Sequence, residues 1–329
     1  MTVGEPVLIG VDVGGTTIAA GVVSEAGEVL VEARAPARAG DALATIERLV
    51  AELCAEAGRR GGRVSGIGVG VPGPVDTVAG RVGEPVPHAP DLAGQPLAAI
   101  LRAQCGLPVF VDNDVNALAL AEWMFGAGRG ARSLVVLAPG TGFGAGIVLD
   151  GHLVRGVAGF GGELGHTPVN FDGPACWCGG RGCLAVYASG RGIAEAAQAR
   201  VAGAAAAPLL AAAGGDPRGI TAALVFRAAA AGDPVAAAVV DEACQALGAS
   251  LGTVVNGLNP EVVVITGGVA ESLVPLEKRI LNAAGEYAFP RALAATRITI
   301  VPGDKRRTVR GPAALVLYER SAPMKGELP

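Results

Sequence analysis

Short apolar runs separated by glycine-rich turns open the chain. Residues 7–13 and 18–23 are apolar and are joined by the turn segment 14–17, and a third apolar run begins at Val29. Runs of this length, rich in β-branched residues and bounded by turn residues, are typical of strands. The pattern therefore predicts three consecutive strands, the first two joined by a Gly/Thr turn.

A similar unit returns later in the chain, at an offset of 125 residues. In this register the apolar run 134–137 leads into a second turn, Gly15 aligns with Gly140, and Thr16 aligns with Thr141. Several matches in one register indicate an internal repeat with two related halves. The alternative, that glycine-rich hairpins resemble one another without being related, stays open at this point.

Longer segments after each unit alternate between helical and strand patterns. The predicted helices span residues 41–57, 95–105 and 234–258, and the predicted strands span 64–71, 109–112 and 262–266. Short apolar strands alternating with helices indicate an α/β fold. At roughly 100–200 residues per domain, 329 residues predict two domains. We expect a small α/β lobe at 1–115, completed by a C-terminal helix near 312–329, and a large α/β lobe at 116–311.

Composition and charge narrow the class of partner. The 51 glycines gather at predicted turns, which favours tight loops in an enzyme over low complexity. A formal net charge of −4 offers no basic face of the kind that a nonspecific nucleic-acid binder carries. The local basic cluster Lys305, Arg306, Arg307 and Arg310 is interpreted as a solvated surface loop. No nucleic-acid partner is expected.

The chain also carries no sign of export or membrane insertion. Residues 1–6 lack a basic segment followed by an apolar stretch. The most apolar window, 201–213, is interrupted by Gly203 and Pro208 and falls short of the ~20 residues that cross a bilayer. We expect a cytoplasmic protein without a membrane partner.

Three glycine turns, each directly after an apolar strand, are candidate phosphate-binding loops. Glycine lets the backbone approach a phosphate, and Thr hydroxyls and backbone N–H groups can donate to its oxygens. Any one such turn is more often a plain hairpin, and neither a Walker-type nor a protein-kinase loop is found. Asp12, at the end of the first strand, is a candidate Mg²⁺ ligand. The loop residues are Gly14, Gly15, Thr16 and Thr17, then Gly140, Thr141 and Gly142, then Gly267 and Gly268.

Six cysteines fall into two groups. One group is scattered over predicted helices and is interpreted as small buried hydrophobes: Cys54, Cys105 and Cys244. The other group crowds one loop: Cys176, Cys178 and Cys183. In a cytoplasmic protein, such crowding indicates a metal site rather than a disulfide.

Motifs in order along nearly the whole chain carry a family resemblance. They are D-V-G-G-T at 12–16, V-P-G-P-V-D at 71–76, D-N-D-V-N-A at 112–117, G-T-G-F-G at 140–144, G-E-L-G-H at 162–166, C-W-C-G-G-R-G-C at 176–183, N-P-E at 259–261 and G-G-V at 267–269. The chain thereby resembles the ROK family (repressors, open reading frames and sugar kinases), and most closely its bacterial glucokinase-like members. The resemblance implies a two-lobed, actin-like, ribonuclease-H-like fold that binds ATP, Mg²⁺ and a sugar, often as a homodimer or homotetramer.

Four candidate metal ligands belong to these motifs. His166, Cys176, Cys178 and Cys183 supply one imidazole and three thiolates, a set that suits a structural, tetrahedral Zn²⁺. A reactive or unpaired cysteine cluster is the alternative. The resemblance implies that the zinc-bound His also faces the sugar, its ring oriented by the metal. Glu163, three residues earlier, is expected to share the sugar pocket.

The segment Asp112-Asn113-Asp114 ends an apolar run and precedes a predicted helix. Taken alone, a carboxylate there is most simply an N-cap. The resemblance instead implies that Asp114 is the catalytic base and that Asn113 and Gly73 contact the substrate. Because the nucleophile in phosphoryl transfer needs little activation, Asp114 would orient the attacking hydroxyl and accept its proton late.

Two positions depart from the family pattern. Ala185 stands where family sugar kinases carry a Glu that contacts the anomeric end of a hexose, and Thr17 stands where many carry Lys. A missing polar partner reshapes substrate discrimination. The expected reaction is phosphorylation of a hydroxyl, the 6-hydroxyl, of glucose or a glucose-like sugar. An amino-hexose such as 3-amino-glucose, or a C7-cyclitol of an antibiotic pathway, is the alternative acceptor.

Other classes of protein remain to be weighed against a kinase. A sugar-responsive ROK regulator would carry a helix-turn-helix domain ahead of the first loop, whereas Asp12 follows only eleven residues, so such a regulator would lack its DNA-binding domain. A zinc module that binds nucleic acid fits poorly with the acidic charge. A sugar sensor with weak turnover is the third possibility.

Overall fold

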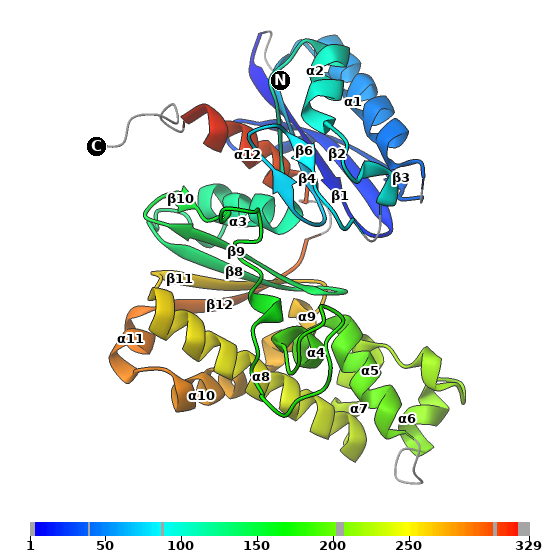
Figure 1. Cartoon of the computed structure of the whole chain (residues 1–329), viewed down its shortest axis with the longest axis vertical. Coiled ribbons are helices and arrows are strands. Elements are labelled where there is room, and N and C mark those ends of the chain that lie inside the picture. Colours follow the sequence, from blue (N-terminus) through cyan, green and yellow to red (C-terminus); the bar gives the residue numbers. More distant parts are fainter. Residues whose placement is uncertain (1–3, 39, 87–88, 202–206, 305–307, 322–329) are drawn as a thin grey trace. The chain divides into compact units, whose positions relative to one another are not determined.

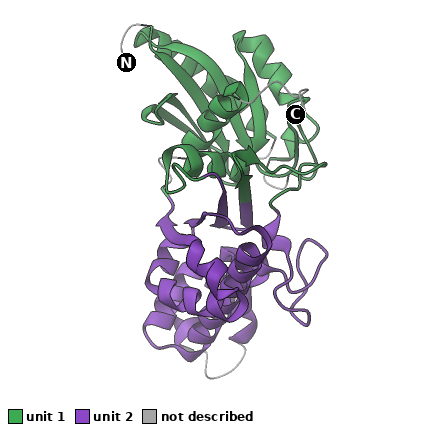
Figure 2. Cartoon of the chain, turned by 90° about the vertical axis from the view of Figure 1, so that its left-hand side faces the viewer, with its two compact units in different colours: residues 1–131, 146–162, 304–329 green, residues 132–145, 163–303 purple. Residues whose placement is uncertain are grey.

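The computed structural model (Figure 1) describes residues 4–38, 40–86, 89–201, 207–304 and 308–321. Internal contacts divide the chain into two compact units (Figure 2): unit 1 contains residues 1–131, 146–162 and 304–329, and unit 2 contains 132–145 and 163–303. The domain boundary expected at residues 115 and 116 lies inside helix α3 (Asp114–Phe125). That helix packs against α12 (Arg310–Ser321) and therefore stays with unit 1. The basic segment 305–307 lies outside the described residues.

Unit 1 is built on a five-stranded sheet. Its central strand β1 pairs antiparallel with β2 and parallel with β4, so a hairpin is joined to a parallel α/β segment. The three opening strands predicted from the sequence are present. In spatial order the strands are β3 (Val29–Pro36), β2 (Thr17–Ser24), β1 (Pro6–Val13), β4 (Arg63–Val71) and β7 (Val109–Asn113). A small separate hairpin is formed by β5 (Val75–Asp76) and β6 (Arg81–Val82).

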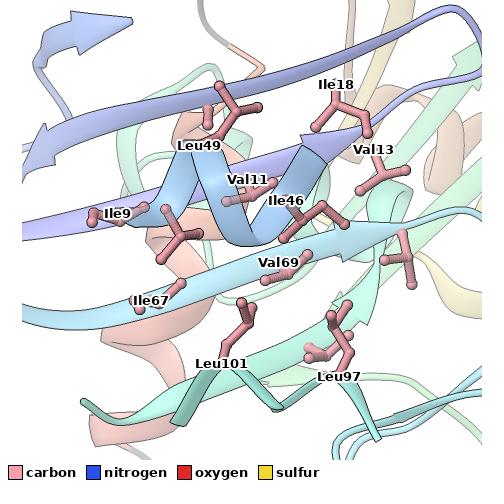
Figure 3. Packing of buried hydrophobic residues seen from close by; sticks show 14 of the residues in the cluster. Ile9, Val11, Val13, Ile18, Ile46, Leu49, Ile67, Val69, Leu97 and Leu101 are labelled. Carbon is pink, nitrogen blue, oxygen red and sulfur yellow. The ribbon is translucent and has the colours of Figure 1, made fainter. Parts of the chain in front are cut away.

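Helices α1 (Ala42–Arg59) and α2 (Leu97–Cys105) cover one face of this sheet. Alternate residues of β1 point to this face because side chains alternate along a strand. Figure 3 shows Ile9, Val11 and Val13 packed with Ile46 and Leu49 of α1 and with Leu101 of α2. This is the main apolar core of unit 1, and it fixes the strand ends that carry the candidate site.

Helix α12 covers the opposite face, and its backbone lies unusually close to the sheet. A Cβ at Gly68 would lie 1.8 Å from the Pro312 carbonyl oxygen, and a Cβ at Gly10 would lie 2.0 Å from that of Val309. Glycine in a strand interior often marks such a close approach of another backbone. The glycines of β1 and β4 therefore provide the surface on which the C-terminal helix rests.

The second sheet repeats the strand arrangement of the first. Its hairpin strands are again followed by a parallel neighbour, since β8 pairs parallel with β11 just as β1 does with β4. This agreement supports the internal repeat. In spatial order the strands are β10 (His152–Leu153), β9 (Phe143–Leu149), β8 (Leu134–Pro139), β11 (Val262–Gly267) and β12 (Arg297–Pro302).

The long helix α8 (Pro234–Leu258) organises the helices of unit 2. It begins where the Asp233 side chain accepts the Ala236 N–H at 2.8 Å, and it ends at Asn259 in the left-handed conformation. Helices α4, α5, α7, α10 and α11 pack against it. Their bounds, with those of α6 and α9, are α4 (Leu184–Ala188), α5 (Gly190–Arg200), α6 (Ala207–Ala212), α7 (Ala222–Ala230), α9 (Ala270–Leu273), α10 (Glu277–Tyr287) and α11 (Pro290–Ala295).

Apart from the C-terminal helix expected near 312–329, which is observed as α12 at 310–321 and whose residues 322–329 lie outside the described residues, the predicted elements agree with the observed ones to within two residues at each end. Helix α8 matches its predicted range, and α1 begins one residue and ends two residues later than expected. Within the described part of the chain, no single helix has the length and hydropathy of a membrane span; α7 and α8 pass that test only as a pair bent by 111°.

Candidate functional site

The segment at the end of β7 is organised by Asn113. Its Oδ1 accepts the N–H groups of Val115 at 2.9 Å and Asn116 at 3.2 Å, so Asn113 is the N-cap of α3. Its Nδ2 donates to the Gly73 carbonyl at 3.2 Å. Asp114 is the first residue of the helix, is half-buried, and accepts the Val115 N–H at 3.0 Å. The structure thus brings together Gly73, Asn113 and Asp114, and the cap is the amide rather than a carboxylate.

Asp112, the residue before Asn113, is buried beneath this cap. Its Oδ1 accepts the Asn113 N–H at 2.7 Å and the Asn116 Nδ2 at 2.9 Å. Its Oδ2 accepts the Nε of Arg155 at 2.7 Å, and Arg155 also pairs with Glu319 of α12. Sequence reasoning missed Arg155 and Glu319 in this network because they are distant in the chain from Asp112 and no motif joins them.

The first candidate loop follows β1 in unit 1. The Gly14 N–H donates to the Thr17 carbonyl at 3.0 Å, which leaves Gly15 and Thr16 exposed at the tip. At the strand end, burial raises the pKa of Asp12, although a hydrogen bond with Thr308 and the charge of Arg34 act in the opposite direction. A half-buried carboxylate beside an exposed loop of this kind is suited to a cation that accompanies a phosphate.

The second and third candidate loops lie side by side in unit 2. The Val269 N–H donates to the Pro139 carbonyl at 2.9 Å, which ties the turn after β11 to the end of β8. Gly267 has φ 135°, and a Cβ there would lie 2.6 Å from the same carbonyl oxygen. Only glycine therefore fits at this junction. The structure brings Gly267 and Gly268 next to the loop that starts at Gly140.

Helix α5 begins directly against the second loop. Its first N–H groups are those of Gly190, which donates to the Gly140 carbonyl at 2.8 Å, and Arg191, which donates to the Thr141 carbonyl at 3.1 Å. These bonds hold the carbonyls of the loop, while Thr141 and Gly142 remain exposed. The helix start thus fixes the shape of the loop without covering its tip.

The four predicted metal ligands converge in unit 2. Their ligand atoms all lie within 4.8 Å of one another: His166, Cys176, Cys178 and Cys183. Local backbone bonds shape the loop, since the Cys176 N–H donates to the Gly180 carbonyl at 2.9 Å. Burial raises the pKa of the Cys183 thiol to about 12, whereas a hydrogen bond from the Gly180 N–H lowers the pKa of Cys178. Thiols bind a metal as thiolates, so metal binding here would release protons.

The spacing of these atoms fits a tetrahedral zinc ion. Two thiolates at the usual Zn–S distance of about 2.3 Å lie about 3.8 Å apart in a tetrahedron, and a thiolate and an imidazole nitrogen lie about 3.5 Å apart. The Cys178 and Cys183 Sγ atoms are separated by 3.8 Å, and the Cys176 Sγ and His166 Nδ1 by 3.5 Å. With this spacing, Nδ1 would be the ligand atom of His166 in a zinc site, which would leave Nε2 for a second partner.

The surroundings of His166 connect the cysteine loop to the second glycine loop within unit 2. The Trp177 ring meets His166 edge-on at 6.3 Å between centroids, and the Arg191 guanidinium lies 4.6 Å from the Trp177 ring centre. Arg191 is the residue whose N–H holds Thr141. Glu163 is exposed just before the short helical turn Leu164–His166, with its carbonyl accepting the His166 N–H at 3.0 Å. Sequence reasoning missed Trp177 and Arg191.

The remaining cysteines agree only in part with their interpretation. Cys244 is buried as expected, but Cys54 and Cys105 are half-buried and form a hydrogen bond with each other. Burial raises the pKa of Cys54 to about 12. Ala185, the departure from the family pattern, is fully buried in α4, where its carbonyl accepts the Ser189 N–H at 3.2 Å.

Comparison with known proteins identifies relatives across the whole chain. The sequence pattern of the ROK family matches residues 8–319. A glucokinase of Halalkalibacterium halodurans is 36% identical over 326 residues, which cover 97% of this chain and 97% of that protein. The crystal structure of a ROK family glucokinase from Streptomyces griseus, in complex with glucose and AMPPNP, is 33% identical with a TM-score of 0.75, covering 94% of this chain and 98% of that one.

A regulator is also similar in structure. A ROK family transcriptional regulator, a homologue of the E. coli MLC protein, superimposes with a TM-score of 0.82 at 28% identity. The alignment covers 96% of this chain but 79% of the regulator. The fold is therefore shared by kinases and regulators, and the distinction between them must come from the site.

Proposed function

Since the chain belongs to the ROK family and is an ATP-dependent sugar kinase with the actin-like α/β fold, we propose that it phosphorylates the 6-hydroxyl of glucose or a glucose-like sugar. The observation that carries this proposal is the position of Asp114. The carboxylate begins α3 beside Asn113, whose amide is held by Gly73. A base in such a fixed setting is suited to orient one hydroxyl of a bound sugar.

In the proposed reaction the sugar oxygen attacks the γ-phosphorus of ATP, and the bond from that phosphorus to the β,γ-bridging oxygen breaks. ADP leaves, and Asp114 accepts the hydroxyl proton late, because the transition state is loose. Asn113 and Gly73 would contact the sugar next to Asp114. Their mutual hydrogen bond at 3.2 Å supports a shared role, since it fixes both before the substrate arrives.

We assign the nucleotide to the glycine loops. The exposed tips of the three loops supply backbone N–H groups and threonine hydroxyls for the phosphates of ATP. Asp12 is the proposed partner of Mg²⁺, which would neutralise phosphate charge. The support for this assignment is the convergence of two loops at Pro139 and the AMPPNP bound by the Streptomyces griseus glucokinase. The residues are Gly14, Gly15, Thr16, Thr17, Gly140, Thr141, Gly142, Gly267 and Gly268.

The cysteine loop is proposed to hold a structural Zn²⁺ that shapes the sugar pocket. His166, Cys176, Cys178 and Cys183 would be its ligands, and their spacing fits a tetrahedron. With Nδ1 on the metal, Nε2 of His166 would meet a sugar hydroxyl near Glu163. We also propose that the protein is cytoplasmic, that it forms a homodimer or homotetramer, and that it has no nucleic-acid partner.

The identity of the sugar depends on Ala185. A buried methyl group stands where the resemblance places a hexose-binding carboxylate, so the anomeric end of glucose would lose one partner. Acceptors of similar shape, such as 3-amino-glucose or a C7-cyclitol, are the alternatives to glucose. A sugar-responsive regulator without turnover is the second candidate function, which the structural similarity to the MLC homologue favours.

A coupled ADP-release assay separates these possibilities. Glucose, mannose, free and N-acetylated amino-hexoses and cyclitols would each be offered with MgATP. Turnover with at least one of them is expected, and the acceptor with the largest kcat/KM identifies the substrate class. If calorimetry detects binding of a sugar while no acceptor on the panel releases ADP, the regulator is the correct function and the kinase proposal is wrong.

The variant Ala185→Glu tests the cause of the altered specificity. We expect it to lower the KM for glucose about tenfold, because a hydrogen bond to a charged group contributes about 1.5–3 kcal/mol. Ala185→Gln is the matched control, since it has the same length without the charge and should give a smaller effect. Because the site is buried, melting temperatures are compared first. A folded Ala185→Glu enzyme with the wild-type KM for glucose would contradict the explanation.

A further inference from the structure

A buried charge network lies directly beneath the proposed catalytic segment in unit 1. Arg155 bridges two carboxylates, Asp112 of β7 and Glu319 of α12. The side chains are 15% exposed for Arg155, 2% for Asp112 and 15% for Glu319. Burying three charges is costly unless each one is paired and hydrogen-bonded, so such a network requires an explanation.

Arg155 is held on several sides. Its guanidinium lies 5.6 Å from the ring centre of Tyr318, and the hydroxyl of that ring accepts the Leu153 N–H at 2.9 Å. Although burial lowers it, the pKa of Arg155 is raised by the charges of Asp112 and Glu319. The guanidinium is therefore permanently charged, and its planar set of N–H donors is held in a fixed position. Its position is set by Glu319 of the C-terminal helix and by Asp112.

Asp112 transmits this position to the catalytic segment. One oxygen is occupied by Arg155, and the other receives the Asn113 N–H at 2.7 Å and the Asn116 side chain at 2.9 Å. Those two donors lie on either side of Asp114. The carboxylate of Asp112 therefore fixes the backbone from which Asp114 projects, at both ends of the first helical turn.

We propose that Arg155 is a positioning residue for Asp114, acting through Asp112, with Glu319 holding the guanidinium in place. This rests on the proposed function, in which Asp114 is the base. Misplacing a catalytic group by about 1 Å can cost on the order of 10²-fold in rate. Arg155 should therefore affect kcat while leaving the binding of ATP unchanged.

The first experiment replaces Arg155 by Met, which keeps bulk and removes charge and donors. We expect kcat to fall roughly 30–100-fold with the KM for ATP within about twofold of wild type. Arg155→Lys keeps the charge but loses the planar set of N–H donors that reaches both carboxylates, and it should lower kcat about 3–10-fold. Arg200, which forms an exposed pair with Glu242 in unit 2, provides the control: Arg200→Met should leave kcat unchanged.

The decisive readout is a double-mutant comparison with Asp114→Asn. If Arg155 acts through Asp114, Arg155→Met should lower the residual kcat of the Asp114→Asn enzyme by less than about twofold. A further loss as large as in wild type would overturn the proposal, as would a folded Arg155→Met enzyme with normal kcat. If Arg155→Met does not fold, the same comparison is made with Arg155→Lys.

Failure of this proposal is distinguishable from failure of the proposed function. If the chain is not a sugar kinase, wild type itself shows no ADP release with any acceptor. If Asp114 is not the base, Asp114→Asn retains wild-type kcat. If only the positioning role is wrong, wild type turns over, Asp114→Asn does not, and Arg155→Met behaves like Arg200→Met.

Discussion

The segment around Asp114 in unit 1 and the cysteine loop in unit 2 are held in different ways. Around Asp114, protein groups place one another: Asn113 caps α3 and Asp112 is paired with Arg155. In the cysteine loop, three thiols and one imidazole lie within 4.8 Å of one another and contact one another. The first arrangement is held by hydrogen bonds and an ion pair between protein groups, whereas the second has the residue types and spacing of a possible metal site.

Substitutions in the two regions should therefore affect different properties of the enzyme. A carboxylate positioned by protein contacts should be replaceable without loss of the fold, so its loss should appear in the chemical step. A histidine positioned by a metal should depend on every other ligand, so the loss of one thiol should appear in folding and in sugar affinity together. The following predictions test this division, beginning with the largest expected effect.

Replacing Asp114 by Asn should lower kcat about 10²–10⁴-fold, because the amide cannot accept the hydroxyl proton. Stability should change little, since the helix cap belongs to Asn113. Steady-state ADP release and thermal unfolding are measured on the same preparation. A large fall in melting temperature would break the comparison, because Asp114 would then support the fold. Wild-type kcat would remove Asp114 from catalysis altogether.

Replacing Cys183 by Ser should release the proposed zinc and weaken sugar binding about 10–100-fold, because His166 loses its orientation. Because Cys183 is buried, the Cys183→Ser protein should also melt at a lower temperature. Metal content is measured by mass spectrometry and sugar affinity by calorimetry. Cys54→Ser, at a thiol outside the cluster, is the control and should retain both. Full sugar affinity in a zinc-free Cys183→Ser protein would show that the metal does not shape the pocket.

The same contrast explains how much could be predicted from the sequence. The closeness of the four Cys and His side chains was predicted, because they lie within one short stretch and their residue types carry the chemistry. The strands and long helices were predicted because apolar periodicity determines them locally. The network at Asp112 was not, because Arg155 is 43 residues from Asp112 and 164 from Glu319, and only the fold brings them together.

Trp177 and Arg191 were missed for a related reason. A tryptophan between two cysteines and an arginine at a helix start have no chemistry of their own that a pattern reveals. Their meaning comes from the stacking of the guanidinium 4.6 Å from the ring and from the N–H that Arg191 gives to Thr141. Sequence reasoning thus named candidate groups for reaction and binding, and the structure added the side chains that contact their segments.

Within unit 1, replacing Asp12 is expected to have the smallest of these effects. Burial raises its pKa above the ordinary value of 3.8, so the folded state holds the proton more tightly than the unfolded state. Its contribution to stability is therefore fully present below the ordinary pKa and is lost as pH rises through the raised one. Near neutral pH the ionised carboxylate opposes folding, which is the opposite of a group placed by pairing.

The variant Asp12→Asn should consequently melt at a higher temperature than wild type near neutral pH, and the difference should shrink towards about pH 4. Thermal unfolding across this range, without nucleotide, is the measurement, with the exposed Asp172→Asn as control. MgATP should stabilise wild type more than Asp12→Asn, because a cation offsets the buried charge. If Asp12→Asn melts lower at every pH, Asp12 is held like Asp112, by its protein partners, and unit 1 has no place reserved for a cation beside the first loop.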